Sequence, residues 1–549
     1  MKVKQFRQYS IRKISIKILL ILLILSITIN VAVEAILKSR INNWIQSNNS
    51  ALYDISFEKI STEIFRGNIS FNNVIIATKP NTDSLAKKNN SLRASFKKLE
   101  LDGIDIADLL FSNAVSVDKI IFYKSQIEVL FDPLAKNKDI KDKNVKDLNR
   151  FNLGGLNRIH IGEFKFVNFS YQSFLFNSEK EKQKVLHIPS TNFLLSGLTL
   201  ENSDKGLSIK NEKSHLEIMK SSIVFDDHNY QLLFDSVRWD LEEQSFHIEN
   251  FKLRPTIKEQ SLADNYKYSE DIINVAIDTI DVFDFDFLNF FKSHEMKTSK
   301  IILTGLDLSI YKDKNKPVNS SKLVNLPHLT LKRLKAPIQI DKFLLKDSKI
   351  NIKERIKSKD TTMQVFINNI SSEIKNLTNK KGYKNNLELS LKGTLMGTAP
   401  IKLMMKAPLS QQDNNLYWGG KIGALNFRTL DKVLYPVLGL KVLSGELIEI
   451  DFKAVSNNIE SRGEMTMLYK NLHASILKSN SNNENHFLTS IANGLIHKSN
   501  PNKRGHIKTV RMYYKRDQNK GLGNYIWKTL QNGIINTITP MRKRVRKLK

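Results

Sequence analysis

The chain has 549 residues, of which 41% are hydrophobic and 26% charged, and it contains no cysteine. This composition is that of a folded protein with a large core, and it excludes disulfides, thiolate zinc sites and cysteine nucleophiles. The formal net charge is +30. Nearly half of that charge lies at the two ends, because residues 1–17 and 518–549 contain six and eight basic side chains and no acidic one. The body between them is only mildly basic.

An apolar stretch follows the basic N-terminal segment and predicts one membrane anchor. About 20 helical residues cross the hydrocarbon core of a bilayer, and residues 18–37 carry a single charge, Glu34. The basic residues before the stretch place the N-terminus in the cytoplasm and the rest of the chain across the membrane. A cleaved signal peptide ending near Ala35 is the alternative. The predicted anchor residues are Ile18, Leu19, Leu20, Ile21, Leu22, Leu23, Ile24, Leu25, Ile27, Ile29, Val31 and Val33.

Alternation of apolar and polar residues dominates the chain after this segment and predicts β-strands. Two short patterns also predict hairpins. Asn72 and Asn73 separate Ile69–Phe71 from Val74–Ile76, and Asp102-Gly103 separates two further apolar runs. Asn and Asp-Gly turns of this kind are typical of tight hairpins.

The strand pattern repeats along the chain. Val115–Val129 aligns without gaps to Ile338–Ile352, and Leu99–Val129 aligns more weakly to Ile280–Ile310. A degenerate third copy runs through Ile159–Phe164. Repeated strands without long intervening helices predict an elongated, repetitive antiparallel β-sheet with a few short helices. The residues predicted to face its apolar side are Val115, Val117, Ile127, Val129, Ile338, Ile340, Ile350 and Ile352.

An open curled sheet would expose this apolar side as a groove, whereas a sandwich or a closed barrel would cover it. Alternation alone does not distinguish these arrangements.

The C-terminal region predicts an amphipathic helix over Gly523–Thr539, with apolar residues at steps of three and four. Tyr525 and Trp527 on this helix are residue types that suit a membrane interface, and a cationic tail follows Pro540. The tail contains Arg542, Lys543, Arg544, Arg546 and Lys547. We therefore predict a peripheral membrane contact here. The alternative is that the helix caps the end of the sheet and the tail is solvated.

Motifs for catalysis, metals and nucleic acids are not found. The eleven histidines are scattered, and the chain has no His-Glu-x-x-His, phosphate-binding loop, dinucleotide-binding motif or nucleophile elbow. The sequence therefore predicts no enzyme, no cofactor and no metal site. The dense basic clusters lie at the ends rather than on the body, so nucleic acid is not an expected partner.

Several segments together resemble the AsmA/TamB-like (AsmA-like) family of Gram-negative envelope proteins. They are the basic N-terminus and anchor, Tyr53–Ile60, Gly67–Val74, the Leu-Asp-Gly-Ile-Asp-Ile and Val-Asp-Lys-Ile motifs, Leu391–Gly393, Gly397–Pro400, Gly423–Phe427, Leu434–Pro436, Ser444-Gly445 and Gly463–Tyr469. The resemblance implies an inner-membrane-anchored periplasmic protein with a lipid-lined β-groove. It implies membrane phospholipids as partners, and a role in moving phospholipid or in outer-membrane biogenesis.

A non-transporting structural or assembly factor for outer-membrane proteins is the alternative function, and its partners would be outer-membrane or envelope proteins. The predicted organisation has five parts. They are a cytoplasmic basic segment (1–17), the anchor (18–37), a repetitive β-rich AsmA-like periplasmic region (38–370), a C-terminal AsmA-like β region (371–480), and a C-terminal strand, helix and basic tail (481–549).

Overall fold

The computed structural model describes residue 39 and residues 53–63, 66–78, 91–105, 108, 114–131, 157–176, 182–203, 206–211, 215–225, 229–240, 242–287, 290, 294–356, 362–380, 382, 385–409, 413–438, 440–476 and 496–539. Two compact units divide the chain. Unit 1 comprises Met1–Val224 and Asp240–Glu242, and unit 2 comprises Phe225–Trp239 and Glu243–Lys549. The predicted boundaries at residues 370 and 480 lie inside unit 2 and stay a prediction. The predicted anchor residues and the cationic tail lie outside the described residues.

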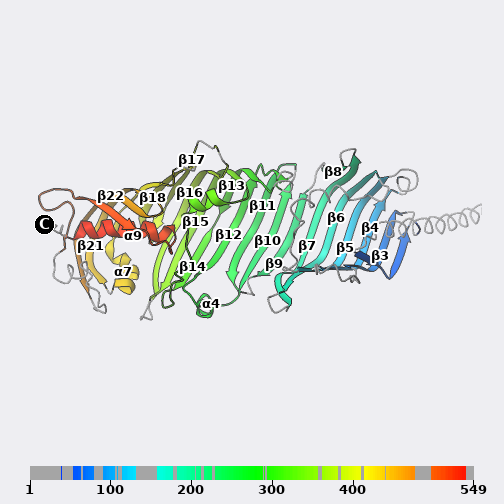
Figure 1. Cartoon of the computed structure of the whole chain (residues 1–549), viewed down its shortest axis with the longest axis horizontal. Coiled ribbons are helices and arrows are strands. Elements are labelled where there is room, and N and C mark those ends of the chain that lie inside the picture. Colours follow the sequence, from blue (N-terminus) through cyan, green and yellow to red (C-terminus); the bar gives the residue numbers. More distant parts are fainter. Residues whose placement is uncertain are drawn as a thin grey trace, which may run out of the picture. The chain divides into compact units, whose positions relative to one another are not determined.

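Unit 1 is built from strands, which lie side by side in Figure 1. They are β1 (Tyr53–Ser56), β2 (Lys59–Glu63), β3 (Asn68–Thr78), β4 (Ser91–Ile104), β5 (Ala114–Phe131), β6 (Arg158–Phe176), β7 (Lys182–Ser203), β8 (Gly206–Asn211) and β9 (His215–Phe225). Strands β3 to β7 pair in chain order. Both β1 and β2 pair with β3, and both β8 and β9 pair with β7. The pairings within unit 1 therefore form one linear succession.

Unit 2 is also mainly β, with short helices inserted between strands. Its strands are β10 (Tyr230–Asp240), β11 (Ser245–Pro255), β12 (Asp271–Phe283), β13 (Met296–Thr304), β14 (Asp307–Asp313), β15 (Ile338–Arg355), β16 (Thr362–Thr378), β17 (Asn386–Leu395), β18 (Ala399–Pro408), β19 (Leu416–Ile422), β20 (Leu425–Asn426), β21 (Leu440–Ser456), β22 (Glu460–Ile476) and β23 (Thr509–Lys515). Its helices are α4 (Glu259–Asn265), α6 (Pro327–Arg333), the 3₁₀ turn η2 (Phe427–Leu430), α7 (Asp431–Leu438) and α9 (Leu522–Ile538). From β11 to β23 the strands pair in chain order, except that β13 and β14 both lie between β12 and β15, and that β19 and β20 both pair with β21. The fold class is thus confirmed as mainly β.

The expectation of an antiparallel sheet is wrong, because three of the strand pairs among the described residues are parallel. β5 pairs with β6 in parallel, and both β13 and β14 pair with β15 in parallel. A parallel pair needs a connection long enough to return the chain to its starting side. Residues 132–157 connect the first pair, and the segment containing α6 connects the second.

The aligned repeats are sheet neighbours in matching register. Met296 pairs with Ile338 and Ile310 pairs with Ile352, as the two alignments together require. In unit 1 the degenerate copy behaves in the same way, since Val115 pairs with Ile159 and Ile120 pairs with Phe164. Equivalent positions of successive copies therefore lie at one level of a sheet.

A left-handed residue interrupts each copy at the same alignment position. Lys124 and Asn168 have φ angles of 48° and 55° in unit 1, and Gly305 and Asp347 have φ angles of 70° and 49° in unit 2. The β5–β6 ladder skips this position, passing from the Tyr123–Val167 pair to the Gln126–Ser170 pair. An interruption of this kind bends a strand and re-aims the side chains beyond it, as a β-bulge does.

Both predicted hairpins are wrong, and the same geometry explains why. Ile69–Ile76 belongs to the single strand β3, and Leu99–Ile104 belongs to the single strand β4. Asn73 has a φ of 51° and Gly103 a φ of 68°, both within a strand. Asn and Gly tolerate the left-handed conformation that hairpin turns and in-strand kinks both require, so the sequence pattern is the same for either.

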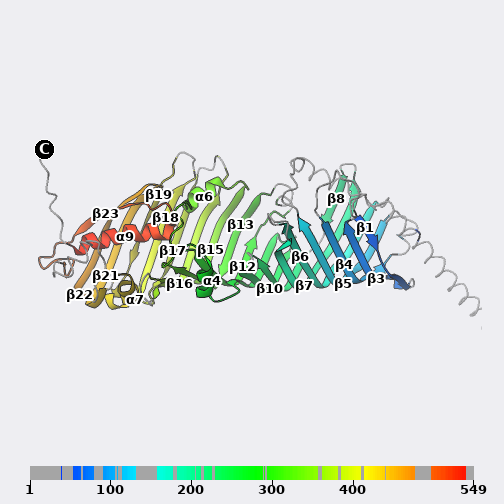
Figure 2. The same cartoon turned by 60° about the horizontal axis from the view of Figure 1, so that its bottom comes forward.

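The predicted C-terminal helix is confirmed as α9. It packs on β22 and β23 (Figure 2), where its half-buried residues join the largest apolar core of unit 2. These residues are Leu522, Ile526, Leu530 and Ile534. No helix among the described residues has the length and apolarity that a membrane crossing requires.

Candidate functional site

Apolar side chains gather on one face of the unit 1 sheet. Its buried members come from β3, β4 and β5, and they are Ile69, Phe71, Val74, Ala94, Phe96, Ile104 and Val117. Half-buried side chains of β5 and β6 pack against them, namely Val115, Ile120, Phe122, Ile127 and Phe166. We call this set the unit 1 apolar face.

Strand β5 keeps its apolar side chains on this face although strict alternation fails twice along it. Val117 and Ile120 are three positions apart instead of two, at the point where the β4–β5 ladder passes from the Ile104–Val117 pair to the Asp102–Lys119 pair and skips Gly103 and Asp118. A second extra residue lies between Phe122 and the buried Ser125, at the left-handed Lys124. Without these interruptions, the side chains beyond each one would point to the opposite face.

Phenylalanine rings continue across the unit 1 apolar face from strand to strand. The Phe122 ring lies 4.8 Å from Phe96 on β4 and 4.7 Å from Phe166 on β6, between ring centroids. Phe166 is in turn 5.8 Å from Phe193 on β7. Ring pairs at these separations attract one another beyond their buried area. The face therefore has a continuous aromatic band across four strands.

Within the described part of unit 1, this face consists of strand residues and their immediate neighbours only. All members of the apolar cluster come from β2 to β6 or, in the case of Phe57, from the turn before β2. Most of its β5 members stay half-buried instead of buried. A sheet packed against a second layer interdigitates its inner side chains with that layer and buries them. In the described residues, the unit 1 apolar face has no second layer.

The second set of predicted residues lies on β15 in unit 2. Ile340 is buried with Val282 and Ile301, and Ile338 packs against them half-buried. Beyond the left-handed Asp347, Ile350 pairs with Leu308 and Ile367, and Ile352 pairs with Ile310 and Val365. These pairs join apolar side chains of three strands. The kink thus preserves the apolar face here as it does in unit 1.

The C-terminal part of unit 2 has an apolar face that helices cover. α9 and α7 pack on β21 to β23, where Tyr469, Met465, Met467 and Met512 are almost fully buried. The Tyr469 hydroxyl donates to the His497 carbonyl at 2.8 Å, and burial raises the pKa of this phenol far above its usual range. This region has the two-layer packing of an ordinary protein core.

A polar cluster closes one end of the covered region. The Arg516 guanidinium donates to the side chain of Asn458 and to the carbonyls of Val324 and Lys520. It lies over the Tyr525 ring at 5.8 Å, and burial lowers its pKa. Nearby on α6, the His328 imidazole donates from Nε2 to the Asn414 carbonyl at 3.1 Å, and burial lowers its pKa.

The structure separates the residues predicted for the membrane-contact tail. Tyr525 is 2% exposed, packs with Leu326 and Leu329, and donates from its hydroxyl to the Asn457 carbonyl at 3.2 Å. Its ring is therefore part of the core and not available at a surface, contrary to expectation. Trp527 is 43% exposed on the same helix. The basic residues Arg542, Lys543, Arg544, Arg546 and Lys547 lie outside the described residues.

Sequence reasoning placed Val115, Val117, Ile127 and Val129 correctly on one strand, but it missed the aromatic residues that extend their face. Phe96, Phe122, Phe166 and Phe193 were not predicted as site residues. The available signal was the recurrence of Phe at repeat-equivalent or paired positions. The two breaks in alternation along β5 concealed this recurrence of phenylalanine.

Among the described residues, no group of three or more His, Asp or Glu side chains is arranged to hold a metal ion. Comparison of the sequence with models of known protein families and with curated proteins gives no match.

Proposed function

We propose that the chain is an inner-membrane-anchored periplasmic protein of the AsmA-like class, whose elongated β-rich body is curled into a groove. In this proposal the groove binds the acyl chains of phospholipids and conducts them between inner and outer membrane, or supports outer-membrane biogenesis. The observation that supports it most strongly is the unit 1 apolar face, which has no covering layer among the described residues.

The free energy of such binding comes from the lipid tails. Exposing an acyl chain to water costs about 0.8 kcal/mol per CH₂ group, and a continuous apolar face removes most of this cost along its length. Half-buried rings such as Phe122 and Phe166 offer contact area without having to leave a packed core. Transfer along this face then needs no bond to be formed or broken.

Register supports continuity from copy to copy. Because equivalent residues of neighbouring repeats pair at one level, an apolar position in one copy meets an apolar position in the next. The Val117–Ile161 pair follows this rule, and the Ile340–Thr298 pair is one exception to it. An acyl chain lying across the strands would therefore meet apolar side chains over several neighbouring strands.

The test is phospholipid content of the purified full-length protein, measured by mass spectrometry after exhaustive removal of detergent. The wild-type protein is expected to retain phospholipid, and Phe122→Lys to retain roughly tenfold less, because the charge lies on the apolar face. Ile121→Lys is the matched control. Residue 121 alternates with 122 and pairs with Glu100 and Lys165 on the opposite face, so lipid should be retained.

A second variant guards against loss of folding. Val129→Lys should reduce bound lipid, because Val129 belongs to the predicted apolar side of β5. Since Val129 lies outside the aromatic band and near the end of the strand, this variant should keep the wild-type circular dichroism spectrum. Lipid-free wild-type protein, or equal lipid in Phe122→Lys, Val129→Lys and Ile121→Lys, would contradict lipid binding by this face. The non-transporting assembly role would then be favoured.

A further inference from the structure

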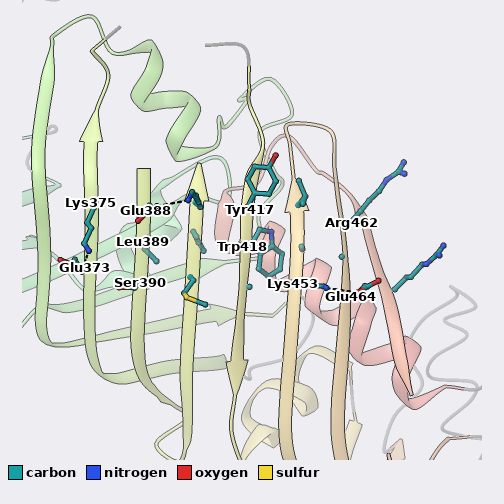
Figure 3. Close-up of a pocket in the computed structure, with 18 residues that line it drawn as sticks. Glu373, Lys375, Glu388, Leu389, Ser390, Tyr417, Trp418, Lys453, Arg462 and Glu464 are labelled. Atoms are coloured by element: carbon teal, nitrogen blue, oxygen red, sulfur yellow. Dashed lines mark ion pairs between the residues drawn. The ribbon is translucent and has the colours of Figure 1, made fainter. Parts of the chain in front are cut away.

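An open hollow lies on the opposite side of the unit 2 sheet from the helix-covered core. It extends over β16 to β23 and has a volume of about 1000 Å³. Tyr417 and Val455 line it and are exposed, whereas their neighbours Trp418 and Ala454 belong to the covered core. This alternation places the hollow on the outer face. Figure 3 shows Tyr417, Lys453, Arg462 and Glu464 around it.

Backbone forms the floor of the hollow at Gly419. Gly419 lies between Met404 and Lys453 in the paired strands. A Cβ atom at Gly419 would lie 2.8 Å from the Phe452 carbonyl oxygen. A side chain at this position would therefore strain the sheet and fill the depression.

The middle of the hollow is apolar. Met404 is 65% exposed, Val455 is 41% exposed and Tyr417 is 40% exposed. Tyr417 pairs directly with Val455, and Met404 pairs with the floor residue Gly419. Large apolar side chains that are exposed next to one another on a hollowed surface are typical of a binding site.

The two ends of the hollow differ in charge. At the β16–β18 end, Lys375 pairs with Glu373 at 3.4 Å and Lys406 pairs with Glu388 at 3.2 Å. At the β22–β23 end, Arg511 makes no ion pair with any described residue, although Glu464 pairs with Lys453. Arg511 lies opposite Glu464 on β22, and Arg462, two residues before Glu464, pairs with Glu460 at 2.7 Å and lies over the Tyr513 ring at 5.9 Å. Among the described residues, the guanidinium at the β22–β23 end that makes no ion pair is therefore that of Arg511.

From this geometry we infer that the hollow binds an anionic amphiphile. Its acidic group would contact the Arg511 guanidinium, since guanidinium groups bind phosphate and carboxylate with paired hydrogen bonds. Its apolar chain would lie over Gly419 against Met404, Tyr417 and Val455. A small molecule suits the site better than a protein, because a stable protein interface needs about 800 Å² per partner and a filled, flatter centre. The site is distinct from the proposed lipid face, since that face belongs to unit 1 and the hollow to unit 2.

The experiment measures equilibrium binding of dodecyl phosphate to the full-length protein in nanodiscs of zwitterionic lipid, with empty nanodiscs as background. Saturable binding is expected, and Arg511→Gln should weaken it about tenfold by removing a charged hydrogen bond. Met404→Glu should weaken it further by placing a like charge beside the apolar chain. Dodecyl maltoside, which has the chain but no charge, and inorganic phosphate, which has the charge but no chain, should each bind at least tenfold more weakly.

Two control variants show whether the amphiphile binds in this hollow or elsewhere on the protein. Lys402→Gln removes a cation from the same outer face of β18, outside the hollow, and should leave binding unchanged. Phe122→Lys disrupts the proposed lipid face and should also leave dodecyl phosphate binding at the hollow unchanged, so failure of one proposal is distinguishable from failure of the other. Equal affinity in wild type and Arg511→Gln, or equal affinity for inorganic phosphate, would overturn the inference. Absence of saturable binding would also overturn it and would favour a protein contact on this face.

Discussion

Two apolar faces of similar composition have different surroundings in this protein. The unit 1 apolar face consists of strands alone among the described residues, and much of it is half-buried. The face of β21 to β23 in unit 2 is covered by α9 and α7 and contains almost fully buried Tyr469, Met465 and Met512. Alternation of apolar residues produces both. What differs is whether a later segment of chain supplies a covering helix.

The difference shows how an apolar strand face acquires a role. Covered by α9, the face contributes to stability and its residues are fixed in a packed core. Without a cover, the same kind of face loses part of its stabilising burial but stays accessible to an apolar ligand. Helix α9 approaches β22 and β23 closely at Gly533, where an added Cβ atom would lie 2.9 Å from Met465 Sδ and 2.8 Å from Met512 Cγ.

The largest expected effect contrasts the two faces directly by removal of one aromatic ring from each. Tyr469→Ala should lower the free energy of unfolding by about 3–5 kcal/mol, because it leaves a cavity in a closed core and an unpaired His497 carbonyl. Phe122→Ala should cost only about 1–2 kcal/mol, since its ring is half-buried and water fills the space. Urea unfolding of the full-length protein, followed by amide hydrogen exchange in β22 and in β5, measures each loss locally.

Equal losses at the two positions would contradict the comparison. They would mean that the unit 1 face is as fully packed as the covered one. Tyr469→Phe provides the control for the covered face, since it keeps the ring and removes only the hydroxyl that donates to His497. It should cost about 1 kcal/mol, close to the usual value for one hydrogen bond.

A smaller effect is expected from enlarging a residue under the covering helix. Gly533→Leu should destabilise the protein by about 1–3 kcal/mol, because a Cβ there already lies 2.8 Å from Met512 Cγ and 2.9 Å from Met465 Sδ. Gly523→Leu on the same helix is the matched control, since nothing lies within 4 Å of its added Cβ. It should stabilise the helix by roughly 0.5–1 kcal/mol through helix propensity. Thermal unfolding of both variants is the measurement, and destabilisation of similar size in both would show that α9 does not pack tightly.

Much of the fold could be predicted from local pattern. Period-two alternation predicted the β class, and the two alignments, of Val115–Val129 to Ile338–Ile352 and of Leu99–Val129 to Ile280–Ile310, together anticipated the register of β13 and β14 with β15. The left-handed kinks were missed. Gly305 is a residue type that favours positive φ, but Lys124 and Asp347 occupy the equivalent position with φ angles of 48° and 49°. At those residues the tertiary pairing, and not the residue type, imposes the conformation.

The coverage of each face was beyond sequence reasoning. Tyr525 and Trp527 are both aromatic residues on one amphipathic helix, yet Tyr525 is buried against α6 and Trp527 is exposed. Which side of α9 meets β23 depends on tertiary contacts, among them the hydrogen bond that the Tyr513 amide of β23 donates to the Asn532 side chain of α9. The hollow above Gly419 likewise depends on strands that meet only in the folded sheet.

The smallest expected effect is a pH dependence confined to the covered region. His328 on α6 is buried, and burial lowers the pKa of its imidazole, with Lys332 and Arg516 acting in the same direction and Asp413 and the Asn414 carbonyl opposing them. The folded state therefore binds fewer protons than the unfolded state. Its contribution to stability is complete above the unfolded-state pKa of about 6.5 and is lost as the pH falls from that value through the lower folded-state pKa.

Amide exchange between pH 7 and pH 5.5 tests this sign and its location. Protection of β22 and β23 should weaken as the pH falls, by at most about 1.4 kcal/mol per pH unit for one proton, whereas β5 and β6 should show no such loss from His328. His328→Asn keeps a side-chain donor near the Asn414 carbonyl but does not titrate, so it should reduce the pH slope in β22 and β23 even if it lowers stability at pH 7. An unchanged slope in that variant would assign the titration to another group, such as His497, whose pKa burial also lowers. A reduced slope would show that His328 makes the stability of the covered face depend on pH. The unit 1 apolar face should lack this dependence, because its described residues include no imidazole.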